Sequence, residues 1–249
     1  MVKIKRLYFD IEVSPNIVTS WNVGYKQKID YQDIIEERKV ICICWNWEGE
    51  KTIHSLSWDE NRDDKTMLIE FIKVINTADE LIAHNGDNFD IKWLRTRCLK
   101  HGITMFPTYV SLDTLTKARR NFRLNSNRLD YIAKYVGVGR KTQTESGLWT
   151  KVAINNDRNA LKRMIKYCMN DVKILKEVYK RMTPYIQNKV HHGVLNGRTK
   201  CSCPECGSKK VTLSKKRTTT TGIERYQMIC SNCTKYFTIS RLTYEEFKK

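Results

Sequence analysis

"YFDIEV", residues 8–13, places two carboxylates in the middle of a strand-like apolar segment. Side chains two residues apart along a strand project from the same face, so Asp10 and Glu12 are expected to lie side by side. Burying one unpaired carboxylate costs several kcal/mol, and two carboxylates close together also repel each other. A folded protein keeps such a pair where another group compensates for its charge.

The composition is that of a folded, strongly basic protein. The 249 residues suffice for one core of about 150–200 residues and a small extra module. Hydrophobic residues make up 41% of the chain, which excludes a disordered chain, and the net charge of +18 favours a polyanionic partner. Nucleic acid is the first such partner and an anionic membrane surface the second. No apolar run approaches the ~18 residues of a membrane-spanning helix, so we expect a soluble cytoplasmic protein.

The nine cysteines fall into two groups. Four lie in apolar periodic segments, where cysteine is most often a small buried hydrophobe: Cys42, Cys44, Cys98 and Cys168. Five cluster in the last 50 residues: Cys201, Cys203, Cys206, Cys230 and Cys233. In a cytoplasmic chain this clustering indicates a metal site rather than disulfides.

Hydrophobic periodicity divides the first 185 residues into strands and helices. Strands are expected at 4–13, 39–47, 51–58, 80–85 and 108–115, with a tight turn at 48–50 joining the second to the third. Helices are expected at 63–76, 89–100, 128–136 and 157–182, with Asn88 as the N-cap of the second. Antiparallel strands followed by alternating helices and strands predict an α/β fold, a mixed sheet flanked by helices.

Two further segments contribute acidic residues. "IAHNGDNFDIKWL" (82–94) puts Asp90 in the first turn of a predicted helix, where an acid also interacts favourably with the helix dipole. "YCMNDVKIL" (167–175) puts Tyr167 and Asp171 four residues apart on one helical face, at the border of its apolar stripe. Each feature alone has a structural explanation, but the ordered set D-x-E, H-N-x-x-x-F-D and Y-x-x-x-D is specific.

This ordered set resembles the DEDDy 3′–5′ exonucleases of the DnaQ-like group, which have the ribonuclease H-like fold. The chain is most similar to the proofreading domains of family B DNA polymerases and their stand-alone phage and bacterial relatives. The resemblance covers residues 4–183. Tyr167 stands where the other branch of the family has histidine, with three residues rather than four between it and Asp171. This places the chain in the tyrosine branch.

The resemblance implies a role for each acidic residue. Asp10 bridges two Mg²⁺ or Mn²⁺ ions, Glu12 and Asp171 complete the first metal site, and Asp90 supports the second ion. Tyr167 orients the attacking water by a hydrogen bond. Physical chemistry agrees, because four clustered carboxylates need cations, and two such ions can activate a water and stabilise the leaving oxygen in phosphoryl displacement.

Several other residues match the family motifs. Asn85 and Phe89 correspond to positions near the scissile nucleotide, with Phe89 packing against the terminal sugar or base. His84 belongs to the same motif, but a hydrogen-bonded structural histidine explains it equally well. Asp113 recurs in such enzymes and also suits a packing role. Val13 departs from the threonine that proofreading domains often have at this position.

A basic stretch runs from residue 117 to residue 141, with aromatic residues at 122, 131 and 135. We predict nucleic-acid contacts from Arg119, Arg120 and Arg123, because basic and aromatic side chains together suit single-stranded nucleic acid. The other basic residues of the stretch are Lys117, Arg128, Lys134, Arg140 and Lys141. A solvated helix face explains the pattern equally well.

Residues 186–200 are expected to form a polar linker between a ribonuclease H-like domain, 1–185, and a small domain, 201–249. In that domain, "CPEC" at 203–206 and "CSNC" at 230–233 frame 23 residues that suit a β-hairpin. Four thiolates in this layout predict one structural Zn²⁺ held by Cys203, Cys206, Cys230 and Cys233, and the module resembles a zinc ribbon. Cys201 is a spare thiol that could replace one ligand, and the histidines at 191 and 192 are further alternatives.

The hairpin of this module is basic, so we predict nucleic-acid contacts from Lys215, Lys216 and Arg217. A folding clamp, or a docking site for another replication or repair protein, explains the module as well. The chain as a whole predicts a metal-dependent 3′–5′ exonuclease releasing nucleoside 5′-monophosphates from DNA, single-stranded by preference, in the cytoplasm of the cell or of a phage host. The alternatives are an exoribonuclease with the same site and a non-catalytic nucleic-acid-binding adaptor.

Overall fold

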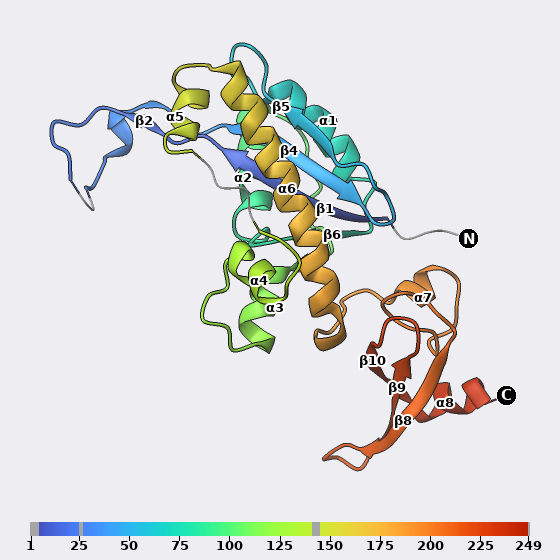
Figure 1. Cartoon of the computed structure of the whole chain (residues 1–249). Helices are drawn as coiled ribbons and strands as arrows, with labels where there is room; N and C mark the ends of the chain where they lie inside the picture. The colour runs from blue at the N-terminus through green and yellow to red at the C-terminus, as the bar shows by residue number, and fades with distance from the viewer. Residues whose placement is uncertain (1–4, 25–26, 141–144, 249) are drawn as a thin grey trace.

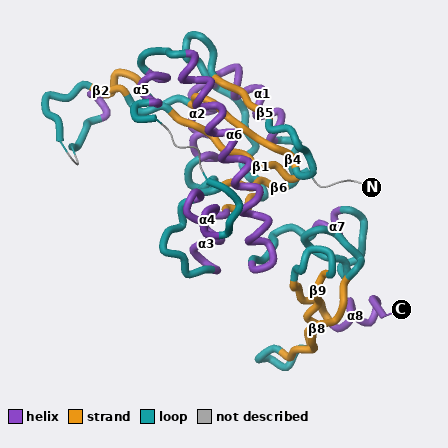
Figure 2. The backbone as a smooth tube through the Cα atoms, viewed as in Figure 1, coloured by secondary structure: helices purple, strands orange, loops and turns teal. Residues whose placement is uncertain are grey.

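The computed structural model describes residues 5–24, 27–140 and 145–248. Residue 4, at the start of the first predicted strand, and Lys141, in the basic stretch, lie outside these ranges. The chain forms a sheet flanked by helices and, at the C-terminal end of a long helix, a smaller β-rich unit (Figures 1 and 2). Within the described ranges, none of the helices combines the length and apolar character that a membrane span needs.

The main sheet has five strands in the order β5-β4-β1-β6-β7. The strands are β1 (Arg6–Val13), β4 (Val40–Trp47), β5 (His54–Ser57), β6 (Glu80–Ala83) and β7 (Ser111–Asp113). The first three are antiparallel neighbours, whereas β6 and β7 run parallel to β1. The predicted mixed sheet is confirmed, and the strand that contains Asp10 and Glu12 lies at its centre.

Two helical layers cover this sheet (Figure 1). One face packs against α1 (Lys65–Ile75) and α2 (Asp90–His101). The other packs against α4 (Leu129–Tyr135), α5 (Leu148–Ala153) and α6 (Arg158–Met182). The even-numbered positions of β1 face the second layer, as Tyr8 does, so the strand's alternation turns Asp10 and Glu12 toward α6.

Helix α3 (Thr114–Asn121) follows β7 directly, so the predicted strand at 108–115 is only three residues long. The predicted N-cap at Asn88 is wrong. The turn before α2 is closed by the Asn85 carbonyl, which accepts from the amides of Asn88 and Phe89, and α2 begins at Asp90 with Phe89 at its N-cap. The side chain of Asn88 instead accepts from Lys92 Nζ at 3.3 Å. Asn85 has a φ of +70°, which periodicity alone does not predict.

Several short elements were not predicted. Strands β2 (Ile17–Val18) and β3 (Ile34–Glu36) pair outside the main sheet, and a 3-10 turn, η1 (Tyr31–Asp33), precedes β3. A second 3-10 turn, η2 (Thr183–Tyr185), ends α6, and α7 (His192–Leu195) lies in the predicted linker. The C-terminal unit contains β8 (Val211–Thr218), β9 (Glu224–Cys230), β10 (Tyr236–Ser240) and α8 (Arg241–Lys248). Its hairpin, β8 and β9, agrees with the predicted one.

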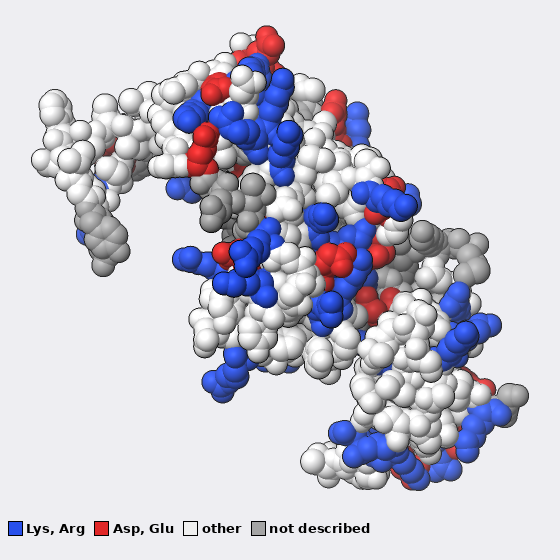
Figure 3. Space-filling model, viewed as in Figure 1, with Lys and Arg blue, Asp and Glu red and all other residues white. Residues whose placement is uncertain are grey.

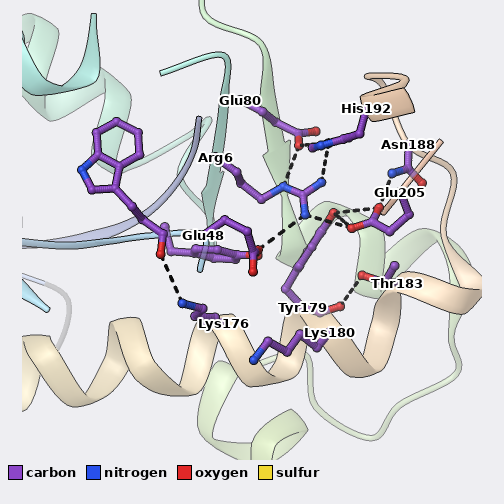
Figure 4. Close-up of polar contacts among 12 residues, drawn as sticks. Arg6, Glu48, Glu80, Lys176, Tyr179, Lys180, Thr183, Asn188, His192 and Glu205 are labelled. Carbon is purple, nitrogen blue, oxygen red and sulfur yellow. Dashed lines mark hydrogen bonds and ion pairs between the residues drawn. The ribbon is translucent and has the colours of Figure 1, made fainter. Parts of the chain in front are cut away.

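A buried polar cluster joins the C-terminal unit to the main sheet (Figure 4). At its centre, Arg6 of β1 is only 4% exposed and donates from Nε to Glu80 Oε2 at 2.8 Å. The same guanidinium donates to Glu205 Oε1 at 2.8 Å and to His192 Nε2 at 2.6 Å. It also lies 4.8 Å from the centre of the Tyr179 ring. One arginine therefore links β1, β6, α6, α7 and the first cysteine pair of the C-terminal unit.

A second contact reinforces this junction. Lys235, which is 3% exposed, donates from Nζ to the Thr183 carbonyl at 2.6 Å and to the Ile186 carbonyl. These carbonyls follow the C-terminal end of α6, where a cation interacts favourably with the helix dipole. The segment predicted as a polar linker therefore takes part in the packing, and Ile186 within it is buried.

On the other side of the sheet, a buried ion pair ties β4 to α2. Asp64, fully buried before α1, accepts from the Val40 amide at 2.9 Å and from Arg97 Nε at 2.7 Å. His101 Nε2 lies 2.7 Å from its other oxygen. Burial would raise the pKa of Asp64, but the hydrogen bonds from Arg97, Val40 and His101 outweigh it and lower the pKa below 3.8.

We expect Asp64→Asn to lower the free energy of unfolding by about 3 kcal/mol at pH 7, because it leaves Arg97 buried without its anion. A carboxylate whose folded pKa is depressed stabilises the protein above its unfolded pKa, here 3.8, and loses that effect as the pH falls through the folded pKa. The difference in the free energy of unfolding between wild type and variant should therefore become smaller below pH 3.8. Urea unfolding at several pH values measures it. The control is Asp63→Asn, at the half-exposed neighbouring residue, which should lower the free energy of unfolding by under ~1 kcal/mol at every pH. Equal losses in the two variants would contradict a stabilising ion pair between Asp64 and Arg97.

Candidate active site and metal centre

The two acids of β1 lie close to α6. Asp10 and Glu12 are partly exposed, and one oxygen of each lies within 4.8 Å of the other and of Cys168 Sγ. Cys168 Sγ is 3.4 Å from the Asp10 carbonyl oxygen and 3.6 Å from its carboxylate Oδ2. Cys168 also lies against Cys42 and Cys44, and all three are buried as the sequence predicted. The thiol therefore holds α6 against the strand that contains the acidic pair.

Asp90 joins this pair from the start of α2. Its side chain is 2% exposed, and Oδ1 accepts from the Ile11 amide at 3.1 Å. The pairing of β1 with β6 ends at Tyr8 and Ile82. Ile11 lies after this last pair, so its amide donates to the Asp90 side chain rather than to the backbone of β6. Since Ile11 lies between Asp10 and Glu12, this bond brings the third carboxylate to the same part of β1.

Asp171 approaches from α6. It is 2% exposed and lies three residues after Cys168, so the two share one helical face, the face on which Cys168 touches Asp10. Tyr167, one position before Cys168, is partly buried, and its ring meets the Trp149 ring edge-on at 6.1 Å. The structure therefore brings Asp10, Glu12 and Asp90 to one part of β1 and places Asp171 on the face of α6 that meets Asp10.

This donor set fits divalent metal ions. Four carboxylates provide the hard oxygen ligands that Mg²⁺ and Mn²⁺ prefer, and two of them, Asp90 and Asp171, are almost fully buried. Burial strengthens the repulsion between like charges and so increases the compensation that a cation supplies.

A cavity of about 600 Å³ opens beside Asp10. Its walls are mostly polar and come from the turn after β6, from α3 and from the loop before α4; they include His84, Asn85, Arg119, Asn127 and Arg128. The volume lies in the range of about 300–1,000 Å³ that is typical of small-molecule sites. The cavity is therefore large enough for a small polar ligand.

The cavity wall is shaped by two residues whose roles the sequence left open. His84 lies between Thr114 Oγ1, at 2.9 Å from Nδ1, and the Asn127 carbonyl, at 3.0 Å from Nε2. Asp113 Oδ1 accepts from the Asn85 amide and from the Leu115 amide, each at 2.9 Å. His84 thus anchors the loop before α4, and Asp113 both caps α3 and fixes the turn that presents Asn85.

Comparison with known proteins places this architecture in a family. The model of the RNase_H superfamily matches residues 7–183, which include every residue of the acidic cluster. The chain belongs to the RNase_H superfamily.

The relatives of this RNase_H region are DNA polymerases. The chain is 26% identical over 207 residues to the DNA polymerase of Thermococcus aggregans, a match that covers 73% of this chain and 11% of the polymerase. It is 42% identical over 72 residues to the PolC-type DNA polymerase III of Ureaplasma parvum serovar 3, covering 29% of this chain and 5% of the relative. The chain thus spans a small part of the relatives it matches.

A solved structure has the same fold as the RNase_H region. The family B DNA polymerase of Pyrobaculum calidifontis superposes with a TM-score of 0.55 and 16% identity, over 73% of this chain and 25% of that one. At this identity the likeness concerns the fold alone.

The residues predicted to contact nucleic acid are placed unequally in this RNase_H protein. Asn85 and Arg119 line the cavity beside Asp10, whereas Arg120 and Arg123 are exposed and absent from its wall. Phe89 is partly buried, with its ring 6.5 Å from that of Trp93. Residues 125–127 also line the cavity but were not predicted as site residues, because a run of polar residues in the sequence is typical of any loop.

The C-terminal unit contains a four-cysteine centre. The Cys203 and Cys233 sulfurs are 3.5 Å apart and those of Cys206 and Cys230 are 3.6 Å apart, and all four lie within 4.8 Å of one another. Tetrahedral Zn²⁺ with Zn–S bonds of about 2.3 Å needs sulfurs about 3.8 Å apart. The hydrogen bond from Cys233 lowers the pKa of Cys203 to about 5, which favours the thiolate that zinc binds.

The two cysteine pairs share one backbone design. In the first pair, the Gly207 amide donates to the Cys203 carbonyl at 2.9 Å, and Gly207 has a φ of +67°. In the second, the Thr234 amide donates to the Cys230 carbonyl at 2.9 Å, and Thr234 has a φ of +58°. These turns aim both thiols of each pair at one point, as in a zinc ribbon.

The alternative zinc ligands lie elsewhere. Cys201 donates from Sγ to the Thr243 carbonyl at 2.9 Å and is not part of the four-sulfur group. His192 contacts Arg6, and His191 Nδ1 accepts from the Val194 amide at 3.2 Å.

Of the basic residues predicted on the ribbon hairpin, Lys215, Lys216 and Arg217 are all exposed on β8. Lys216 is paired with Glu224 of β9, which reduces the charge it offers to a ligand. Figure 3 shows Lys and Arg side chains spread over α6 and along the C-terminal unit, with fewer acidic side chains among them. This surface suits a polyanion.

We expect Asp113→Ala to lower the free energy of unfolding by about 2 kcal/mol, because α3 loses its cap and the Asn85 amide loses its acceptor. Asp113→Asn retains an oxygen that can accept both bonds, so it should cost less than half as much. Urea denaturation of the two variants measures the difference. A cost below about 0.5 kcal/mol for the alanine variant would show that the cap contributes little.

Proposed function

We propose that this protein is a metal-dependent 3′–5′ exonuclease that releases nucleoside 5′-monophosphates from single-stranded DNA. The observation that carries the proposal is the acidic pair Asp10 and Glu12 beside an open polar cavity, with Asp90 bonded to the amide between them. Asp171 is buried on the face of α6 that meets Asp10. Membership of the RNase_H superfamily and the likeness to DNA polymerases support the proposal.

The four carboxylates would hold two divalent ions, which when bound lower the pKa of a water molecule and neutralise the charge that develops on the phosphate. The Ile11 amide keeps Asp90 oriented, and the Cys168 thiol keeps Asp10 oriented. Tyr167, one position before Cys168 on α6, would orient the attacking water through its hydroxyl group. Its ring is held by Trp149, so little rotational freedom is lost when the water binds.

The cavity residues would position the last nucleotide. Arg119 and Arg128 offer charge-assisted hydrogen bonds to phosphate oxygens, and Asn85 offers an amide for the sugar or base. Asp113 and His84 would act through these residues, as positioning groups. We assign DNA rather than RNA as the substrate because the relatives are DNA polymerases.

The test is incubation of the protein with 5′-labelled single-stranded DNA, or with RNA of the same sequence, in Mg²⁺, Mn²⁺ or EDTA. The proposal predicts a ladder that shortens from the 3′ end, requires metal, and is absent with Asp10→Ala. Faster shortening of RNA would reassign the substrate to an exoribonuclease. Binding of both nucleic acids without shortening in either metal would leave a non-catalytic adaptor as the better explanation.

A further inference from the structure

A second groove lies where the segment after α6 meets the C-terminal unit. It has a volume of about 530 Å³, and its walls include Lys189, His191, Arg217, Tyr236 and Phe237. Lys189 and Arg217 are exposed, and Tyr236 is 49% exposed. Two accessible cations beside an accessible aromatic ring are the combination that binds single-stranded nucleic acid, through phosphate neutralisation and base stacking.

Helix α3 connects this groove to the active-site cavity. Arg119, near its C-terminal end, lines the cavity. Lys117, two residues earlier, donates from Nζ to the carbonyl of Gln187 at 3.0 Å, and Gln187 lines the groove. One helix of eight residues therefore lines the cavity and contacts a residue of the groove wall. Figure 1 shows α3 beside the C-terminal end of α6, from which the chain leads into the C-terminal unit.

The surface between the two sites is basic and aromatic. Burial lowers the pKa of Lys117, and the positive charges of Lys189 and Arg120 lower it further, so these three cations lie near one another. At the end of α3, the Phe122 ring meets the Tyr185 ring edge-on at 5.9 Å, and Tyr185 is 71% exposed. Cations held close together repel, and a bound polyanion removes that repulsion.

The groove and the cavity are fixed relative to each other. Two contacts join the C-terminal unit to the main domain. Glu205 accepts from Arg6 of β1, and Lys235 donates to the Thr183 carbonyl at the end of α6. Both contacts are buried, which distinguishes this junction from a flexible tether. A strand that occupies both sites must therefore span a constant separation.

We propose that the single strand whose 3′ end occupies the active-site cavity continues over α3 and enters the ribbon groove. Lys189 and Arg217 contact its phosphates there, and Tyr236 stacks on a base. The inference rests on the proposed exonuclease for the placement of the 3′ end. It assigns the zinc ribbon the role of holding the substrate several nucleotides from the cut, rather than that of a folding clamp alone.

The experiment measures the affinity of two 5′-labelled single-stranded DNAs, of about 4 and about 20 nucleotides, by fluorescence anisotropy. All proteins carry Asp171→Asn so that the DNA stays intact. The test variants are Lys189→Ala, Tyr236→Ala and the double variant that carries both changes. The control is Lys209→Ala, which removes an exposed lysine of the ribbon outside the groove. The double variant should bind the longer DNA about 10- to 100-fold more weakly and the shorter DNA unchanged, and Lys209→Ala should change neither.

The nuclease activity of the wild-type protein separates the two proposals. A protein that shortens DNA, with groove variants that bind both lengths as the parent does, would overturn the groove assignment and leave the exonuclease intact. Equal weakening for both lengths would also overturn it, because the short DNA reaches only the cavity. Selective loss of the longer DNA in a protein without nuclease activity would uphold the groove and overturn the exonuclease.

Discussion

Replacing Asp171 by asparagine is expected to lower the rate of mononucleotide release by more than about 100-fold. Loss of a residue that hydrogen-bonds to a metal ligand already lowers metal affinity or activity by about 10–100-fold, and loss of a direct ligand should lower them further. The asparagine keeps the size of the side chain but removes the charge that holds a cation. Steady-state kinetics in saturating Mg²⁺ measures the loss.

The same substitution should not weaken the metal-free protein. Asp171 is buried on the face of α6 that meets Asp10, so removing its charge lowers the cost of burying it, and the thermal midpoint without divalent metal should stay equal or rise. Glu177→Gln is the matched control, an acid-to-amide change on the same helix at a surface ion pair with Lys180. It should leave both activity and stability nearly unchanged. Loss of activity together with a large fall in stability would indicate a structural role for Asp171.

The second large effect is expected from removal of zinc. Structural zinc sites contribute about 10–16 kcal/mol of apparent binding free energy near pH 7, and that energy stabilises the folded state. The apolar core of the C-terminal unit is small: besides its buried cysteines it contains Val211, Met228 and Ile239. We therefore expect Cys203→Ser to unfold β8, β9 and β10 while the main sheet remains folded. Hydrogen exchange of the two sets of strand amides distinguishes them.

Cys201→Ser is the control for this experiment. Its sulfur donates to the Thr243 carbonyl, a bond that a serine hydroxyl can replace, and it lies outside the four-sulfur group. This variant should keep one zinc per chain and normal exchange in β8 and β9. Unchanged exchange in the Cys203→Ser protein would contradict a structural zinc site. Loss of zinc from the Cys201 variant would assign Cys201 as a ligand.

Unfolding of the ribbon should also lower the stability of the main sheet, although the sheet remains folded. Glu205 lies between the two cysteines of the first pair and accepts from the guanidinium of Arg6. When the ribbon unfolds, Arg6 keeps Glu80 but loses Glu205, and Tyr179 loses the acceptor of its hydroxyl group. A partly broken buried network is costly.

Sequence periodicity predicted the parts of the fold that depend on local alternation. The two-residue period of β1 placed Asp10 and Glu12 on one face, and the four-residue spacing of Tyr167 and Asp171 placed them on one side of α6. The cysteine spacing predicted the ribbon, and its four sulfurs do converge. The short pair of β2 and β3 had no comparable pattern, because two or three residues are too few to show a period.

The contacts that shape the site depend on residues far apart in the sequence. Arg6 and Glu205 are separated by 199 positions, and His84 meets a carbonyl 43 positions away. Neither partner carries a local signal for the other. The left-handed backbone of Asn85 is similarly set by Asp113, which holds its amide from the end of a different strand. Such roles become visible only when the strands are assembled.

The most direct test of a carboxylate-held metal centre is the rate of nucleoside 5′-monophosphate release from single-stranded DNA as Mn²⁺ is titrated into the metal-free protein. Wild type should show a rate that rises from zero and saturates, while Asp171→Asn, verified as folded, stays near zero at the same Mn²⁺ concentrations. Release that is independent of Mn²⁺, or equal in the two proteins, would mean that the four carboxylates do not form the catalytic centre.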